Sequence, residues 1–136
     1  MTDIQAAISA AASGMRAQTT RMRVAAENVA NANSTGTSAT EDPFRRRIPL
    51  METTTLASGA QGVRVRGAAF DMTQFRQEFN PSHPAADPDG YVRLPNVDTL
   101  VEMMDMRDAT RAYEANLNMI EAARSMTTRA LDLLRR

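Results

Sequence analysis

The sequence predicts a mainly α-helical protein with a small β insert, whose long N- and C-terminal helices pair as an antiparallel coiled coil. Three observations support this prediction. Apolar residues recur at helical spacing near both ends, turn-forming residues crowd the middle, and short alternating segments lie between those turns. The chain of 136 residues has four Phe, two Tyr and no Trp, which favours close helix packing over a globular core.

The first helix is predicted over residues 4–32, with Thr2 or Asp3 as its N-cap. Its apolar positions alternate in steps of four and three, which is a heptad seam with one polar member. The seam consists of Ile4, Ile8, Ala11, Met15, Gln18, Met22, Ala25 and Val29. A helix of this kind is about 42 Å long and cannot bury its stripe against itself. Turn-forming residues over 33–38 end it.

The middle of the chain predicts a small sheet or a pair of hairpins. Expected strands cover residues 44–52, 63–66 and 75–79, with a further extended piece at 91–95 and a turn at 58–62. Pro49 weakens the first strand. Three prolines and a glycine in residues 80–90 predict an extended connector with tight turns. Strands this short need support from other elements.

The last helix is predicted from Asp98 or Thr99 to the end of the chain, about 57 Å if fully helical. Glu102 follows Thr99 by three residues, which predicts a capping box. Its apolar stripe consists of Leu100, Met103, Met106, Ala109, Tyr113, Leu117, Ile120, Ala123, Ala130 and Leu134, widened by Met104, Met126 and Leu131.

Both terminal helices need partners, so the simplest arrangement pairs them and leaves the insert at one end. Residues 1–33 and 97–136 would then form one discontinuous coiled-coil assembly domain, and residues 34–96 a loop with a small β-containing insert. Apolar surface would remain on both helices, which predicts self-assembly or docking to related chains.

Composition argues against several functional classes. The 16 basic residues, all Arg, balance 16 acidic ones, and the triplet Arg45–Arg47 alone is weak evidence for nucleic-acid binding. Without cysteine, thiol catalysis and thiolate metal sites are excluded. His83 is the only histidine, and the Asp87–Gly90 segment lacks the later ligands of a calcium loop, so it is interpreted as a turn. We therefore expect no enzyme activity, no cofactor and no metal.

The N-terminus lacks the basic start and apolar run of a secretory signal, and no 18-residue apolar stretch occurs. The sequence therefore predicts no membrane insertion. If the protein leaves the cytoplasm, it needs a route without a cleaved signal peptide.

Several segments resemble the flagellar axial proteins, the family of rod, hook and hook-associated subunits. Residues 28–33 resemble the signature that ends the first helix in this family, although only Gly36 is kept from the motif that follows. Residues 80–92, 95–97, 102–106 and 111–116 resemble the proximal-rod members. The matching positions are Asn28, Asn31, Asn33, Gly36, Pro81, His83, Pro84, Asp87, Asp89, Gly90, Tyr91, Pro95, Asn96, Arg111, Tyr113, Glu114 and Asn116.

The resemblance implies a structural subunit of the proximal rod that is exported by the flagellar type III apparatus, assembles in the periplasm and transmits torque. Implied partners are other proximal- and distal-rod subunits, the rod–export-gate adaptor and copies of itself. The residues expected to pack within and between subunits are Ile4, Ile8, Met15, Met22, Val29, Leu100, Met103, Met106, Tyr113, Leu117, Ile120, Leu131 and Leu134.

The two predicted helices by themselves also allow a function of a different class. A soluble coiled-coil adaptor or export chaperone would work as a discrete oligomer in the cytoplasm. It would have folded terminal helices in isolation and would not polymerise with rod subunits.

Overall fold

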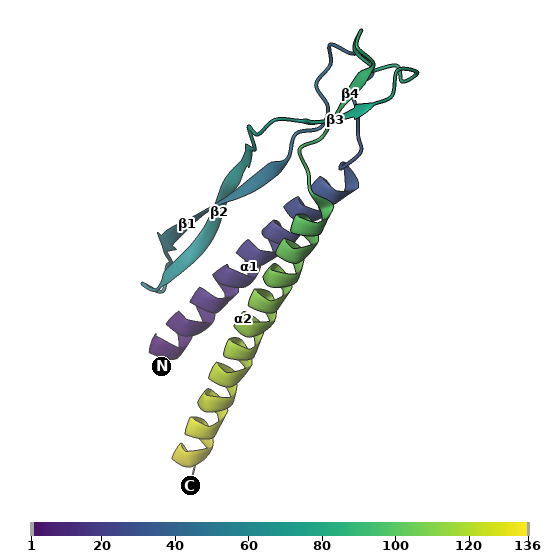
Figure 1. Ribbon diagram of the computed structural model, residues 1–136. Coiled ribbons are helices and arrows are strands. Elements are labelled where there is room, and N and C mark those ends of the chain that lie inside the picture. Colours follow the sequence, from purple (N-terminus) through teal and green to yellow (C-terminus); the bar gives the residue numbers. More distant parts are fainter. Residues whose placement is uncertain (1, 136) are drawn as a thin grey trace.

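The computed structural model describes residues 2–135. Two long helices flank four strands, which form two separate two-stranded antiparallel sheets (Figure 1). The protein is therefore mainly helical with a small β insert, as predicted. The elements are α1 (Thr2–Ala30), β1 (Arg47–Thr55), β2 (Gln61–Phe70), β3 (Arg76–Phe79), β4 (Tyr91–Leu94) and α2 (Thr99–Leu134).

The two helices lie side by side and run in opposite directions, so both ends of the chain lie at the end of the molecule away from β3 and β4 (Figure 1). α1 has 29 residues and α2 has 36. The two helices diverge toward that end, where Ile4 and Ile8 face Arg124 and Thr127 across a hollow of about 430 Å³.

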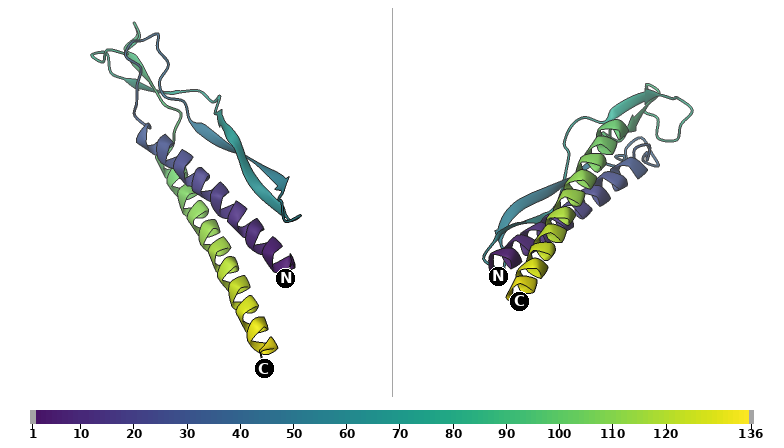
Figure 2. Two further views of the ribbon diagram at one scale, coloured as in Figure 1. Left: turned by 180° about the vertical axis from the view of Figure 1, so that it is seen from behind. Right: turned by 90° about the horizontal axis from the view of Figure 1, so that it is seen from below.

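α1 lies between α2 and the β1–β2 hairpin (Figure 2). It therefore has two covered faces, whereas the sequence predicted a single seam. Small residues fill both faces and let the backbones approach closely. The buried residues of α1 are Ala11, Ser13, Ala17, Val24, Ala25 and Asn28.

The β1–β2 hairpin folds back along α1, while only β3 and β4 extend beyond the helix pair as the sequence predicted for the whole insert (Figure 2). One reason is a hydrogen bond from the backbone N–H of Val63 to the hydroxyl of Ser13, 3.0 Å long, which fixes β2 against α1. The hairpin turn runs from Leu56 to Ala60, where the Leu56 N–H donates to the Ala60 carbonyl.

β1 begins three residues later and ends three residues later than predicted, and β2 is longer than the expected residues 63–66. Residues 44–46 are not in the strand. Arg45 instead stacks on Phe75, 4.1 Å from the ring centre, and Arg46 points into a polar cluster. Pro49 lies opposite Ala68 in a sheet of only two strands, where a missing N–H is tolerated. The register shifts between Leu50 and Met51, opposite Gly67 and Val65.

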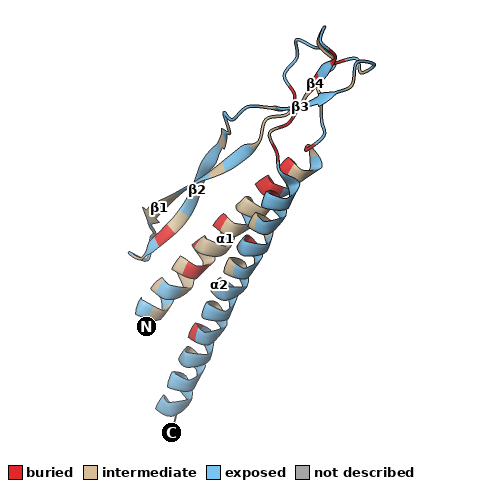
Figure 3. Cartoon of the chain, in the orientation of Figure 1, coloured by how far each residue is buried: buried red, intermediate tan, exposed pale blue. Residues whose placement is uncertain are grey.

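Asp98 is the N-cap of α2, and its carboxylate accepts the Leu100 N–H at 3.0 Å. The predicted capping box is wrong, because the Glu102 side chain turns away from Thr99 and binds Asn28 and Arg46. Buried positions gather along α1 and at the end of the helix pair next to the insert, while most of α2 is exposed (Figure 3). Among the described residues, neither helix is apolar enough over its length to cross a membrane.

Candidate assembly surfaces and the polar junction

The α1–α2 contact is built from small residues. Ala109 and Ala123 of α2 are 0% and 2% exposed, and Gly14 of α1 packs directly on Asn116. A Cβ atom added at Gly14 would lie 2.8 Å from the Asn116 amide nitrogen, which shows how closely the helices approach there. Next to this contact, Arg21 pairs with Asp105, and the Thr110 hydroxyl donates to the sulfur of Met22 at 3.4 Å.

The predicted packing residues of α1 are all half-buried: Ile4, Ile8, Met15, Met22 and Val29. Those of α2 divide into two groups. Met106, Tyr113 and Ile120 are half-buried beside Ala109 and Ala123. The others are exposed: Leu100 at 66%, Met103 at 58%, Leu117 at 39%, Leu131 at 48% and Leu134 at 83%. This second group lies away from α1 or beyond its end.

The exposed apolar surface of α2 is larger than this second group. Val101, Met104, Met119, Met126 and Leu133 are also exposed, by 48% to 74%. The steps between them are 3, 15, 7 and 7 residues, which place all five on one flank of α2 beside the α1 contact, with Asp108 in the interval between Met104 and Met119. Exposed apolar side chains gathered on one flank of a helix are typical of an interaction surface.

A cluster of polar side chains, which we call the polar junction, joins both helices to the insert. Its members are Asn28, Arg46, Asp71, Asn96 and Glu102. Asn28 is 1% exposed and makes three contacts. Its amide nitrogen donates to the Arg47 carbonyl at 2.9 Å and to Glu102 at 3.2 Å, and its oxygen accepts the Arg47 N–H at 3.0 Å. This pairing imitates a β-sheet contact and holds the start of β1 on the end of α1.

Glu102 is 1% exposed and bonded to the guanidinium of Arg46, whose other side reaches Asp71 at 3.3 Å. Burial lowers the pKa of Arg46, but Glu102 and Asp71 outweigh burial and raise that pKa above its ordinary value. The pKa of Asp71 is lowered, mainly by hydrogen bonds from Thr73 and further by Arg46. A buried carboxylate without such a partner would be strongly destabilising.

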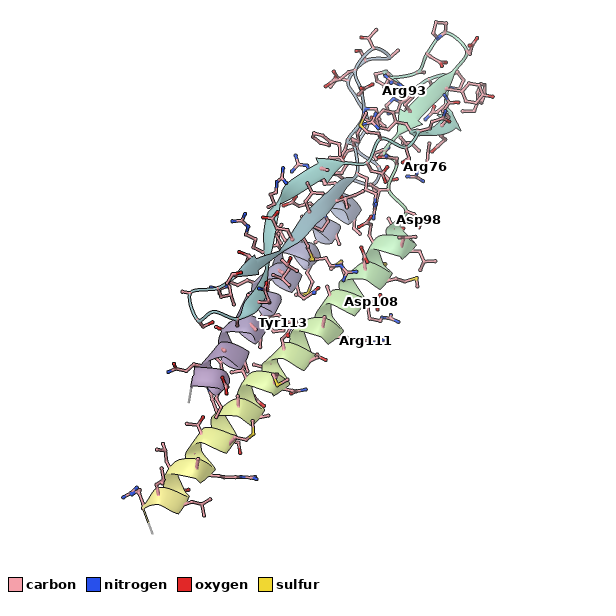
Figure 4. The ribbon with its side chains drawn as sticks, turned by 90° about the vertical axis from the view of Figure 1, so that its left-hand side faces the viewer. Arg76, Arg93, Asp98, Asp108, Arg111 and Tyr113 are labelled. Carbon is pink, nitrogen blue, oxygen red and sulfur yellow. The ribbon has the colours of Figure 1, made fainter. Side chains whose placement is uncertain are left out.

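Asn96 completes the junction, and Arg76, which lies outside it, supports the same end of the helix pair. Asn96 accepts the Arg46 N–H at 2.8 Å and donates to the Asp71 carbonyl at 2.9 Å. Arg76, at the start of β3, donates to the Ala32 carbonyl at 3.0 Å and the Pro95 carbonyl at 3.1 Å. It thereby satisfies a carbonyl past the end of α1 while holding the segment that leads into α2. Figure 4 shows Arg76 and Asp98 at this end of the molecule and Arg93 farther into the insert.

Comparison with known proteins identifies the family. A curated protein of Agrobacterium fabrum named flagellar basal-body rod protein FlgC is 41% identical over 99% of this chain and 98% of its own length. Proteins of the same name from Aquifex aeolicus and Salmonella typhimurium are 37% and 34% identical, over 97% and 90% of this chain and 98% and 92% of their own lengths. The chain belongs to the FlgC family of flagellar basal-body rod proteins.

The family model described as "Flagellar basal body rod FlgEFG protein C-terminal" also matches residues 89–133, which include β4 and most of α2. FlgC-family members are structural components of the flagellar rod and serve motility, and this is not an enzyme family. The chain is accordingly a structural rod subunit of the bacterial flagellum.

The FlgC motif positions divide by burial. Asn28, Gly90 and Pro95 are buried, and Asn31, Gly36, His83, Asp87, Asn96, Tyr113 and Asn116 are half-buried. Asn33, Pro81, Pro84, Asp89, Tyr91, Arg111 and Glu114 are exposed. Thus only Asn28 and Asn96 of this set enter the polar junction, and Asn116 lies in the helix contact at Gly14. Arg111 projects from α2 away from the junction (Figure 4).

The FlgC connector between β3 and β4 is a chain of tight turns, as its prolines predicted. The Asp87 carboxylate accepts the Tyr91 N–H at 2.8 Å, and the Gly90 N–H donates to the Asp87 carbonyl at 2.9 Å. Nδ1 of His83 accepts the Ala85 N–H at 3.0 Å, so this histidine stabilises a turn. Gly90 has φ +87°, and a Cβ there would lie 2.8 Å from the Phe79 ring.

The sequence alone does not indicate the roles of Arg46, Asp71, Arg76 and Glu102. In the sequence Arg46 is one member of a charged triplet, and the position of Glu102 predicts a capping role instead. The one available signal was Glu102 itself, an acidic residue four positions before Met106 and seven before Ala109 in the apolar stripe. A charge on the buried face of a helix requires a buried partner, which only the fold supplies.

Proposed function

We propose that this chain is a proximal-rod subunit that transmits torque through helix packing, with α1 and α2 pairing as an antiparallel coiled coil. The observation that carries this proposal is the exposed apolar flank of α2, from Val101 to Leu133, on a protein of the rod family. Removing this flank from water requires neighbouring chains, because α1 already occupies the adjacent face. About 25 cal/mol is gained for each Å² of apolar surface buried there.

The proposal includes the division into domains. Residues 1–33 and 97–136 form the assembly domain, and residues 34–96 the insert. The polar junction supports this division, since it joins the insert to both helices at one point and leaves the remaining length of α2 free for neighbours. In this arrangement Leu100, Met103, Leu117, Leu131 and Leu134 contact other subunits, and Met106, Tyr113 and Ile120 contact α1.

The same proposal places the chain in the periplasmic rod, exported by the flagellar type III apparatus without a cleaved signal peptide. Its partners are other proximal- and distal-rod subunits, the rod–export-gate adaptor and further copies. The continuous α2 supports a mechanical role, because a rod that carries torque needs long elements that do not bend at a Gly or Pro. Residues 99–134 contain neither.

Helix disruption tests this function. In a flagellated strain that lacks its own copy of this gene, Leu117→Pro should abolish basal-body rods and motility, because proline removes a backbone hydrogen bond and kinks α2. Thr99→Pro is the matched control. It introduces the same residue at the first position of α2, where proline is tolerated and where Asp98 already has the extended ψ of 108° that precedes proline. Normal rods with Leu117→Pro would contradict the proposal.

A further inference from the structure

A groove between α1 and β2 carries more positive charge than the acidic side chains around it balance. We call it the arginine groove and define it by Arg16, Thr20 and Arg23 of α1 and Arg64, Val65 and Arg66 of β2. It consists of two adjoining hollows of about 280 and 320 Å³ that share Thr20 and Val65. The four arginines stand at its edges and are exposed.

The charge of the arginine groove is only partly balanced. Arg23 pairs with Glu27 at 2.7 Å and Arg64 pairs with Glu52 at 2.5 Å, both near the surface. Among residues 2–135, no carboxylate lies within 4.0 Å of the guanidinium groups of Arg16 or Arg66. The groove therefore favours an acidic occupant with an apolar side chain to cover its floor.

α2 presents such a surface, which we call the acidic strip: Glu114, Leu117 and Glu121. Steps of three and four residues place these side chains on one face of the helix. All three are exposed, Leu117 by 39%, because Ala109, Asn116 and Ala123 make the contact with α1. Among the described residues, neither Glu114 nor Glu121 forms a salt bridge.

We propose that the arginine groove of one chain receives the acidic strip of a second copy. The strip cannot enter its own groove, because α1 lies between α2 and the hairpin (Figures 1 and 2). Two exposed carboxylates then meet the two arginines that lack partners, and Leu117 covers the groove floor. Opposite charges at the edge of such a contact fix its register and speed association.

This contact joins two different surfaces, so each docked copy still offers a free groove and a free strip. A heterologous contact of this kind continues from copy to copy and does not close into a dimer of two equal halves. The inference rests on the proposed function and deepens it, since it names one contact by which copies of the chain follow one another along the rod.

Charge reversal tests the contact in the full-length chain, expressed in the strain that lacks this gene. Arg16→Glu with Arg66→Glu should abolish copy-to-copy docking, and so should Glu114→Arg with Glu121→Arg. When one strain expresses both variants together, the acidic groove of the first variant can receive the basic strip of the second. Docking and motility should then return. All four side chains are exposed, so the fold should be retained, which circular dichroism checks.

Cross-linking reports docking directly, because the chain has no cysteine of its own. A chain that carries both Thr20→Cys in the groove and Leu117→Cys in the strip should give covalent dimers and longer oligomers with a short bismaleimide in purified basal bodies. Asn118→Cys in place of Leu117→Cys is the control, since Asn118 lies about 100° around the helix from its neighbour. We expect about a tenfold lower yield of the cross-link with the control, and no basal bodies to purify with either charge-reversed pair, because each pair abolishes docking.

Two results would overturn the docking proposal while leaving the rod function intact: motile cells without the Thr20–Leu117 cross-link, or equal yields with Asn118→Cys. Basal bodies that do not contain the chain would instead contradict the rod function itself. The two failures are therefore distinguishable in one experiment.

Discussion

The side-chain amide of Asn28 donates to the carboxylate of Glu102 at 3.2 Å, across 74 positions of sequence, and both residues are 1% exposed. One residue comes from the last turns of α1 and the other from the first turn of α2. Because Asn28 also holds the Arg47 backbone, its side chain joins the two helices to each other and to the start of β1.

Replacing Asn28 should therefore destabilise the protein clearly. Asn28→Ala removes three hydrogen bonds, which leaves the N–H and carbonyl of Arg47 and the buried carboxylate of Glu102 without the Asn28 side chain, so we expect a loss of about 2–4 kcal/mol in the free energy of unfolding. Urea titration followed by circular dichroism measures it. Asn118→Ala, on the exposed face of α2, is the matched control and should stay within about 0.5 kcal/mol of the parent. Equal stability of the two variants would contradict a structural role for the junction.

Glu102 tests the same junction from α2. Glu102→Ala should cost about 3–5 kcal/mol, because it leaves the Arg46 guanidinium without its main partner. Glu102→Gln keeps the shape and one acceptor, so its loss should be smaller. We expect the unfolding midpoint of Glu102→Ala to be lower than that of Glu102→Gln. A Gln variant as unstable as the Ala variant would show that charge alone matters there.

Acidification should weaken the junction through Asp71. Thr73 donates to this carboxylate and Arg46 lies beside it, so its folded pKa lies below the ordinary value of 3.8. A lowered folded pKa means that the stabilisation is complete above the ordinary pKa and is lost as pH falls through the folded one. The difference in unfolding free energy between the parent and Asp71→Asn should therefore be constant near neutral pH and shrink below about pH 4. A constant difference down to the acid limit would contradict this assignment.

The helix crossing at Gly14 predicts a coupled pair of substitutions. Gly14→Ala gains about 1 kcal/mol of helix propensity but pushes against the Asn116 amide, which a new Cβ would meet at 2.8 Å. In an Asn116→Ala background that conflict is absent, so the same substitution should stabilise more there. Denaturation of the four members of this cycle gives the coupling, which we expect to be about 0.5–2 kcal/mol. Zero coupling would mean that the helices do not cross at this point.

Alanine substitutions at two glycines with positive φ distinguish the cost of backbone strain from the cost of a steric conflict. Gly59 has φ +78° and open space around it, while Gly90 has φ +87° with the Phe79 ring where a Cβ would lie. Gly59→Ala should cost only the conformational penalty, about 1–2 kcal/mol. Gly90→Ala should cost more, and hydrogen exchange should show the added loss in β3 and β4. Equal losses for the two would contradict the tight packing of Phe79 on the Gly90 turn.

The helices were predictable because helix periodicity and caps are local. Residues 4–32 and the start at Asp98 came within two residues of α1 and α2. Strand limits were less accurate, since Arg45 and Arg46 leave the predicted first strand for partners that lie far away in sequence, Phe75 and Glu102. The family resemblance rests on motif residues such as Asn28 and Asn96. Their positions in the sequence do not reveal which residues they contact.

The sequence by itself determined two long terminal helices, a β insert with turns at its prolines and glycines, and membership in a family of structural rod proteins. Tertiary structure decided which faces of those helices are used. α1 is covered on two sides because the hairpin folds back onto Ser13, and α2 turns Ala109, Asn116 and Ala123 inward while Leu117 stays outside. Periodicity marks every apolar position on a helix alike, and only the placement of neighbouring elements separates those that face α1 from those left for another chain.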